Sequence, residues 1–248
     1  MADLPILFSG SMVRAILREI EQPGTGKTQT RRVLNPQPFV DGYYEGEVDC
    51  TFVPSPASNL SAYFRFAASA VDGGAIRTET YDPRYAVGDR LYVRETWAPL
   101  DALTHSDPGT QALADRGFYR ADDSTVEGEI SRWRPGIHMP RWASRITLIV
   151  TDVRVQRLQE ISEGDAIAEG VEPLHGGWFP YGITTFMTTF VNGHEVPAQY
   201  CPTACGSFCM LWDSLNADRG YGWEANPWVA AYTFKPILGN VDQIAEAA

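Results

Sequence analysis

Residues 26–32 read Gly-Lys-Thr-Gln-Thr-Arg-Arg and form the densest group of chemically active side chains in the sequence. Threonines alternating with longer polar residues predict a strand. Its side chains then alternate between two faces, with Lys27, Gln29 and Arg31 on one and Thr28, Thr30 and Arg32 on the other. A twist or bulge where the strand begins would let Lys27 and Thr30 converge. A basic, solvated edge strand is the simpler interpretation of the same residues.

The residues before this strand are similar to a phosphate-binding loop but lack one of its fixed points. The motif Gly-x4-Gly-Lys-Ser/Thr would end at Gly26-Lys27-Thr28, but Glu21 stands where the first glycine is required. A phosphate-binding loop also follows a strand and opens a helix. Here a helical pattern from Met12 to Ile20, with Ser11 as the expected N-cap, comes first and a strand follows. The sequence therefore argues against a nucleoside triphosphatase.

The rest of the chain predicts strands and short helices joined by long connections. Further strands are expected at residues 5–8, 50–53, 62–67, 91–96, 118–120, 146–158 and 228–237. Short helices are expected at 162–170 and 208–215. Ser162 and Asp165 have the spacing of a capping box for the first of these, and Gly170 fits its end. Because strands do not alternate regularly with long helices, we expect an α+β fold built on a small barrel or strongly curved sheet.

Length and composition fit one globular domain with insertions. The chain has 248 residues, 44% of them hydrophobic and 21% charged, which excludes a disordered or fibrous protein. We expect a single domain over residues 1–248, with insertions near 36–84, 98–130 and 172–203. The net charge of −11 disfavours loose, sequence-independent binding to nucleic acid, since such binding needs broad basic surface. The chain has 18 arginines but only two lysines, Lys27 and Lys235, which draws attention to Lys27.

Two further features bear on the compartment. No run of residues approaches the length of a membrane span, and the first residues lack a basic, then apolar, leader pattern. Four cysteines fit a reducing compartment, so we expect a cytoplasmic protein without membrane partners.

Three cysteines, Cys201, Cys205 and Cys209, are spaced four residues apart. Together with Cys50 or a histidine they could hold zinc or an iron–sulfur cluster. Their spacing matches no usual CxxC pattern, and Pro202 and Gly206 are expected to break a helix there. Free thiols are therefore the preferred interpretation, and we expect no metal and no cofactor.

The segment at 27–32 also resembles a known family. Lys27-Thr28-Gln29-Thr30-Arg31-Arg32, after a short helix, is similar to the signature of ASCH domains, which have a PUA-like β-barrel fold. Further stretches resemble a large phage and prophage group of that family: residues 88–93, 133–145, 161–170, 212–216 and 226–229. The resemblance implies a PUA-like small β-barrel with short flanking helices and long loop insertions.

The best-understood enzymes of that family are small bacterial N4-acetylcytidine amidohydrolases, which use a lysine, a threonine and a glutamate. By motif position these correspond to Lys27, Thr30 and Glu169. A lysine that gives up its proton can act as base, the threonine hydroxyl as nucleophile, and the glutamate can orient the lysine or relay a proton. The implied substrate is N4-acylated cytidine, cytosine or a related modified nucleoside.

The resemblance also suggests substrate-binding residues. Arg32, with Arg31 beside it, would stabilise an oxyanion or hold the pyrimidine carbonyl. Trp97 or Trp142 would stack on the base, and Glu95 would add a polar group to the site.

A second function stays open, because relatives in the PUA-like class bind RNA or a modified base without catalysis. A basic stripe formed by Arg132, Arg134, Arg141 and Arg145 would support that function. The sequence, more than twice as long as the small enzymes, leaves the role of the insertions and the oligomeric state undecided. A phage accessory protein that binds a host protein is a third hypothesis, for which the sequence holds no signature.

Overall fold

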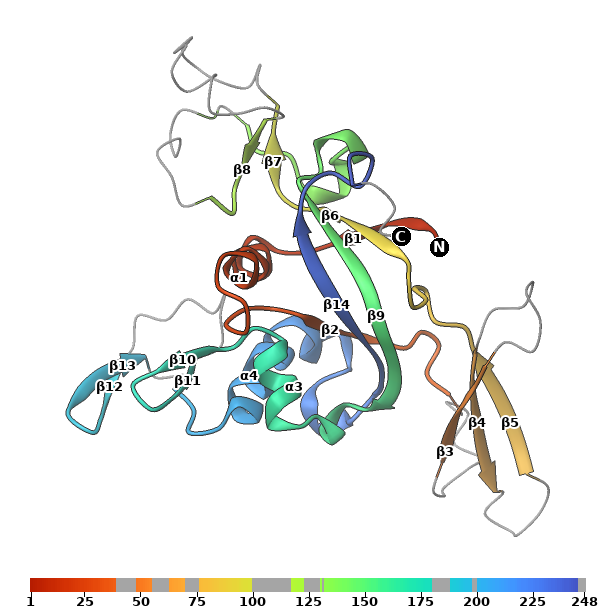
Figure 1. The fold of residues 1–248 in the computed structure, drawn as a ribbon. Helices are drawn as coiled ribbons and strands as arrows, with labels where there is room; N and C mark the ends of the chain where they lie inside the picture. Colours follow the sequence, from red (N-terminus) through yellow and green to blue (C-terminus); the bar gives the residue numbers. More distant parts are fainter. Residues whose placement is uncertain are drawn as a thin grey trace. The chain divides into compact units, whose positions relative to one another are not determined.

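The computed structural model describes residues 1–38, 48–54, 63–69, 76–99, 117–122, 130, 132–179, 188–197 and 200–244. The described chain is mixed α+β, with mostly strands and few helices (Figure 1). Its internal contacts divide it into two compact units. Unit 1 comprises Met1–Thr28, Gly88–Val150 and Phe234–Ala248, and unit 2 comprises Gln29–Val87 and Thr151–Thr233. Two long strands, β9 (Ile146–Arg157) and β14 (Trp228–Leu238), have residues in both units.

The sheet of unit 1 has the order β1-β6-β9-β14. Strand β1 (Asp3–Leu7) pairs in parallel with β6 (Arg90–Arg94), and β6 pairs antiparallel with β9. Alternate residues of β6, Leu91 and Val93, are buried, as period-2 alternation requires of a strand with one face on a core. The described residues of this unit also form the 3-10 turns η2 (Gly136–His138) and η3 (Arg141–Ala143). A short pair of strands comprises β7 (Trp97–Ala98) and β8 (Phe118–Tyr119).

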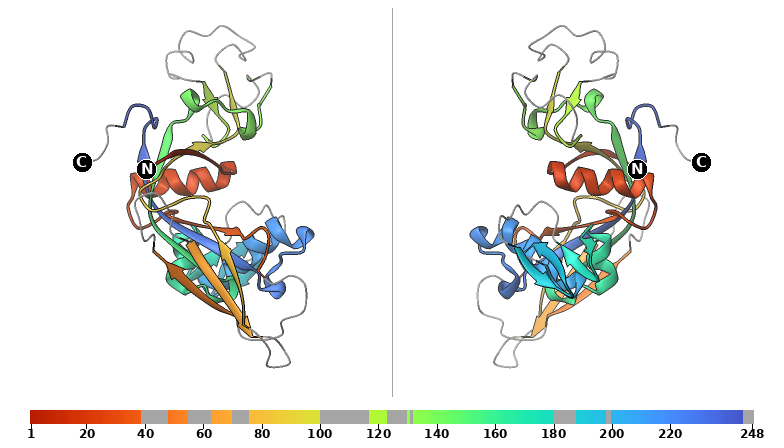
Figure 2. Two further views of the ribbon diagram at one scale, coloured as in Figure 1. Left: turned by 90° about the vertical axis from the view of Figure 1, so that its right-hand side faces the viewer. Right: turned by 90° about the vertical axis from the view of Figure 1, so that its left-hand side faces the viewer.

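Helix α1 (Gly10–Glu21) belongs to unit 1 and is seen side on in Figure 2. It buries Val13, Ala15 and Ile16. The N-cap is Ser9, whose Oγ accepts from the Met12 amide at 3.4 Å. The expectation that Ser11 caps the helix was wrong, because the helix begins at Gly10 and the Ser11 hydroxyl instead bonds to Ser9 Oγ at 3.0 Å.

The sheet of unit 2 has the order β9-β14-β2, with β2 (Gln29–Val33) antiparallel to β14. A separate three-stranded sheet comprises β3 (Asp49–Val53), β4 (Tyr63–Ser69) and β5 (Ile76–Tyr81). Phe66 of β4 packs edge-on against Trp228 of β14, with ring centroids 5.0 Å apart.

Helices α3 (Glu163–Ala168) and α4 (Ala204–Asn216) pack together in unit 2 (Figure 1). The Glu163 carboxylate accepts hydrogen bonds from the Ala204 and Cys205 amides at 2.7 and 3.2 Å, which satisfies free N–H groups at the start of α4. Three 3-10 turns accompany the helices: η4 (Leu158–Glu160), η5 (Ala217–Arg219) and η6 (Trp223–Ala225).

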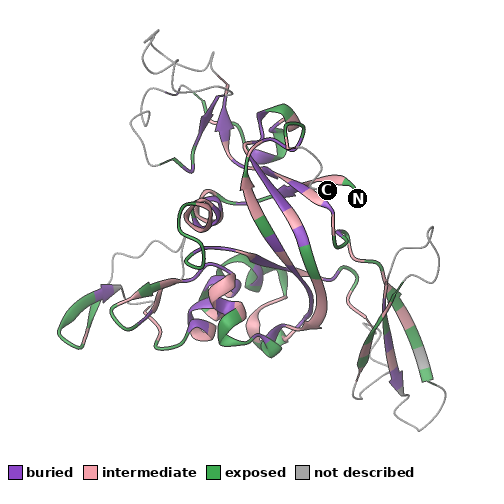
Figure 3. Ribbon diagram, in the orientation of Figure 1, coloured by how far each residue is buried: buried purple, intermediate pink, exposed green. Residues whose placement is uncertain are grey.

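The described part of unit 2 also contains two hairpins, β10 (Glu172–Leu174) with β11 (Gly177–Phe179), and β12 (Thr188–Val191) with β13 (His194–Pro197). Much of β12 is exposed (Figure 3). The sequence predicted only an insertion here.

The strands and helices predicted from the sequence are all present, with ends shifted by a few residues; β5, β7 and the two hairpins were not predicted. The predicted insertions fall partly outside the described residues, most of all the one at 98–130. In the described part of the chain the strands do not close into a barrel.

Candidate functional site

Strand β2 presents different residues to its two faces. Its pairing with β14 is regular, with Gln29 opposite Thr233, Thr30 opposite Tyr232 and Arg31 opposite Ala231. Directly opposed residues of antiparallel strands point to the same face, and neighbours along a strand point to opposite faces. Gln29 and Arg31 therefore share one face, and Thr30 points to the other, together with Tyr232.

The face of Gln29 and Arg31 holds a buried network of charges against α3. Arg31 Nη1 donates to Glu169 Oε1 at 3.0 Å and to Gln29 Oε1 at 2.5 Å, and Arg31 Nη2 lies 3.2 Å from Asp165 Oδ2. The side chain of Arg31 is completely buried, and that of Glu169 is 4% exposed. Phe208 of α4 covers the guanidinium, whose carbon lies 5.8 Å from the ring centroid. A charge this deep is tolerated only when it is paired.

Asp165 anchors this network. It accepts from Gln29 Nε2 at 3.1 Å and from Arg154 Nη2 at 2.8 Å. Burial works to raise the pKa of Asp165, but the hydrogen bonds from Arg154 and Gln29 and the charges of Arg31 and Arg154 outweigh it and lower the pKa to about 2. Asp165 is therefore ionised throughout the neutral range and balances one of the two arginines.

Helix α3 is placed by its ends. Ser162 Oγ accepts from the Asp165 amide at 3.1 Å, which confirms the predicted N-cap. Gly170 has a φ of +97°, a conformation that glycine adopts without strain, and its amide bonds to the Ile167 carbonyl at 2.8 Å. Glu169 is thus the C-cap residue of α3, and its carboxylate is directed to Arg31.

The opposite face of β2 carries Thr30 and a group of tyrosines. Tyr232, beside Thr30, packs edge-on against Tyr85, with centroids 5.1 Å apart. Burial and the neighbouring Tyr81 raise the pKa of Tyr232, so its phenol stays protonated at neutral pH. Arg32 follows Thr30 by two residues on β2, so strand alternation places it on this face as well.

Lys27 lies in unit 1, two residues before β2 begins, and is completely buried. Its amide donates to the Ala15 carbonyl at 2.9 Å, so the chain before it lies directly on α1. Gly26 permits this approach, since a Cβ there would lie 2.3 Å from the Ala15 oxygen and 2.4 Å from the Glu19 nitrogen. The Glu19 carboxylate accepts the Gly24 and Gly26 amides at 2.9–3.0 Å. A phosphate-binding loop would offer such amides to its ligand. Here both amides already donate to Glu19, which agrees with the argument against that motif.

The remaining predicted substrate-binding residues lie together in unit 1. Glu95 is buried and forms two hydrogen bonds with Arg145, at 3.0 and 3.2 Å. Burial raises the pKa of Glu95, and the bonds from Arg145 only partly offset this. Trp97 is buried and Trp142 is 56% exposed, and their rings meet at 90° with centroids 5.8 Å apart.

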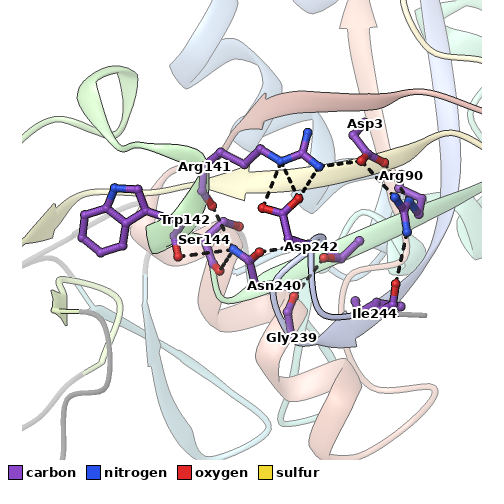
Figure 4. A network of polar contacts seen from close by, with 10 residues as sticks. Asp3, Arg90, Arg141, Trp142, Ser144, Gly239, Asn240, Asp242 and Ile244 are labelled. Carbon is purple, nitrogen blue, oxygen red and sulfur yellow. Dashed lines mark hydrogen bonds and ion pairs between the residues drawn. The ribbon is translucent and has the colours of Figure 1, made fainter. Parts of the chain in front are cut away.

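Two arginines of the expected basic stripe are engaged by carboxylates. Arg141 pairs with Asp3 at 2.5 Å and with Asp242 at 2.6 Å, as Figure 4 shows. Arg145 pairs with Glu95 and also with Asp122, at 2.8 Å. Arg132 and Arg134 are exposed, and the guanidinium of Arg134 lies over the Trp97 ring.

The ion pairs of Arg141 lie next to a set of hydrogen bonds centred on Asn240, which Figure 4 also shows. The buried Asn240 amide donates to the carbonyls of Arg141, Trp142 and Ser144 at 2.8, 3.4 and 2.7 Å (Figure 4). Its Oδ1 accepts from the Asp242 amide at 3.0 Å. This side chain holds η3 against the turn that follows β14, which fixes the backbone from which Trp142 projects.

The three clustered cysteines do not share one helix. Cys205 and Cys209 lie on α4, which continues through Gly206, so the prediction that this glycine breaks the helix was wrong. Cys201 precedes the helix and exchanges backbone hydrogen bonds with Trp178. All four cysteines, Cys50 included, are half-buried and outside disulfides. In the described residues, no three His, Cys, Asp or Glu side chains are grouped to hold a metal ion.

The structure thus brings some predicted residues together and separates others. Arg31 and Glu169 are in direct contact, whereas Thr30 and Arg32 lie on the opposite face of β2. The sequence reasoning missed Asp165 and Gln29 as members of the charge network. Asp165 was noticed only as part of a helix cap, and a carboxylate on the inward side of a capped helix is the signal that could have found it.

Comparison with known proteins gave no match, whether with family models, with curated proteins or with solved structures. Among the described residues, no helix is both long and apolar enough to cross a membrane.

Proposed function

We propose that this protein is an amidohydrolase that removes the acyl group from N4-acylated cytidine, cytosine or a related modified nucleoside. The proposed site residues are Lys27, Thr30 and Glu169, with Arg31 and Arg32 as substrate-binding or charge-stabilising residues. The proposal rests first on the resemblance of residues 27–32 to the ASCH signature. It extends to a PUA-like small β-barrel as the fold and to the cytoplasm as the compartment.

The observation that carries the proposal is the burial of Lys27. Lysine is among the residues least often fully buried, since removing an ammonium group from water is costly. One of only two lysines in the chain nevertheless has no exposed surface. Ionisable side chains held away from water concentrate at functional sites. A buried lysine within the signature therefore supports a chemical role over a solvated edge strand.

The Arg31–Glu169 pair gives the second support. The ion pair holds the Glu169 carboxylate in one orientation, and preorganised charge is the main means by which enzymes stabilise a transition state. Glu169 would receive or relay a proton while Arg31 keeps its carboxylate oriented. A solvated carboxylate at a helix end would not need a buried partner.

The proposed reaction is acyl transfer in two steps. The Thr30 hydroxyl oxygen attacks the acyl carbonyl carbon and Lys27 takes the hydroxyl proton. Lys27 then passes this proton to N4, and the C–N4 bond breaks as N4 leaves as an amine. Water then attacks the resulting Thr30 ester and releases the carboxylic acid. Thr30 and Glu169 lie on opposite faces of β2. The role of each residue is therefore tested with its own variant.

The alternative function is non-catalytic binding of RNA or a modified base. An elongated basic stripe would favour it, but Arg141 and Arg145 are neutralised by carboxylates. A protein of net charge −11 suits a small uncharged nucleoside better than a phosphate backbone. This balance favours the enzyme.

The direct test is to incubate the purified protein with N4-acetylcytidine and follow conversion to cytidine by absorbance. Lys27→Ala, Thr30→Val and Glu169→Ala are compared with the wild type, and Lys235→Ala is the control for loss of a lysine outside the site. Turnover that is lost in the three site variants and kept in Lys235→Ala supports the proposal. Binding of N4-acetylcytidine without turnover in the wild type would favour the alternative.

A further inference from the structure

Two sulfur atoms meet in unit 2. Cys201 Sγ lies 3.4 Å from Met210 Sδ, with the thiol positioned to donate to the thioether. Cys201 is held in place by the backbone, because its N–H and C=O both bond to Trp178, at 2.9 and 2.8 Å. The contact therefore joins a fixed segment to the outer face of α4.

A third sulfur belongs to the same face of α4. Cys209 and Met210 follow Gly206 by three and four residues, so each neighbours Gly206 on the surface of α4. Cys201 lies over Gly206, because a Cβ built there would be 3.5 Å from Cys201 Cβ and 3.6 Å from its Sγ. Cys209 and Met210 therefore flank the position that the Cys201 thiol occupies. The absence of a side chain at Gly206 leaves room for the Cys201 thiol.

The surroundings of these sulfurs are acidic and accessible. Asp213 follows Cys209 by four residues on α4, so the two positions are neighbours on the helix surface. Cys201 and Cys209 are half-buried and Met210 is 36% exposed, so an ion can reach all three.

We propose that Cys201, Cys209 and Met210 bind one Cu(I) ion. Two thiolates and a thioether are soft ligands of the kind that select Cu(I), whereas structural zinc requires a fourth ligand in a tetrahedron. Binding forms three Cu–S bonds and releases the two thiol protons to solvent, with no change of oxidation state. Apparent affinity therefore rises with pH. The site is separate from the proposed amidohydrolase residues and does not depend on that activity.

Cys205 provides a matched control. It lies on the same helix one turn before Cys209, but its thiol donates to the Ile161 carbonyl at 3.5 Å and its amide to Glu163. It therefore faces α3 and not the Cys201–Met210 contact.

The test is an anaerobic titration of the reduced full-length protein with Cu(I) in competition with bathocuproine disulfonate. The wild type and Cys205→Ser are expected to withdraw one equivalent from the chelator. Cys201→Ser, Cys209→Ser and Met210→Leu should lose at least the roughly 10–100-fold in affinity that loss of an outer-shell partner costs. X-ray absorption of the loaded wild type should show sulfur ligands only.

Helix content of the serine variants is checked by circular dichroism. If they lose helix, Met210→Leu still reports on the thioether, because leucine keeps the apolar volume of the side chain. Failure of the wild type to compete with the chelator would overturn the proposal. So would equal weakening in Cys205→Ser and Cys201→Ser.

Discussion

Arg31 and Glu169 form a buried ion pair, with Nη1 3.0 Å from Oε1, although 138 residues separate them in the sequence. The pair joins strand β2 to the end of helix α3 and fixes the carboxylate on which the proposed chemistry depends. Its consequences for stability can be measured independently of any substrate.

Replacing Arg31 by methionine is expected to destabilise the protein strongly. Glu169 and Asp165 would lose the guanidinium that compensates their burial, and breaking a buried pair from one side costs about 3–5 kcal/mol. Urea denaturation monitored by tryptophan fluorescence measures the loss. Arg154→Met is the control, because Arg154 is 40% exposed and an exposed pair contributes about 1 kcal/mol or less. Similar losses of unfolding free energy in Arg31→Met and Arg154→Met would contradict the larger contribution assigned to Arg31.

Acid should weaken the fold through Asp165. Its pKa is lowered from 3.8 to about 2 in the folded protein, so its ionised form contributes stability above about pH 4, and that contribution is lost as the pH falls toward about 2. Asp165→Asn lacks this titration. The melting temperature of the wild type should fall more steeply than that of Asp165→Asn over this range. Parallel curves would show that Asp165 is not held as an ion.

The cap of α3 offers a test of how the sequence positions Glu169. Ser162→Ala removes the acceptor for the Asp165 amide and should cost about 1 kcal/mol, while Ser162→Thr, which keeps the oxygen, should cost little. Equilibrium denaturation compares the three proteins. An alanine variant as stable as the wild type would mean that other contacts set the start of this helix.

Asn240 is expected to be needed for its donors and not only for its volume. Asn240→Asp keeps the shape of the side chain but turns the donating nitrogen into an acceptor that faces three carbonyls. Unsatisfied buried polar groups cost about 1–3 kcal/mol or more when charged. The variant should melt at a lower temperature than the wild type, with the gap widening from acid to neutral pH. A constant gap would indicate that the aspartate is not ionised there.

The elements that the sequence predicted are those with a strong local signal. Strands β9 and β14 have long apolar or alternating runs, and α3 has Ser162 at one end and Gly170 at the other. The hairpins were missed despite the Asn192-Gly193 pair, whose φ angles of 52° and 80° suit a tight hairpin turn. Their strands have only three or four residues, too few for period-2 alternation to stand out.

The sequence predicted part of the charge network but not its pairing. It named Arg31 and Glu169 and missed Asp165, and strand alternation correctly placed Gln29 with Arg31 and apart from Thr30. No local pattern indicates that Gln29 meets Asp165, 136 residues away. Such contacts depend on the packing of β2 against α3, which periodicity does not encode.

The proposed chemistry is tested most directly by Lys27→Arg, measured for N4-acetylcytidine turnover and for N4-acetylcytidine binding in parallel. Arginine keeps the positive charge but does not give up its proton at neutral pH. A base at this position predicts that turnover is abolished while the dissociation constant stays close to that of the wild type. Near-normal turnover by Lys27→Arg would contradict the role of Lys27 as the base.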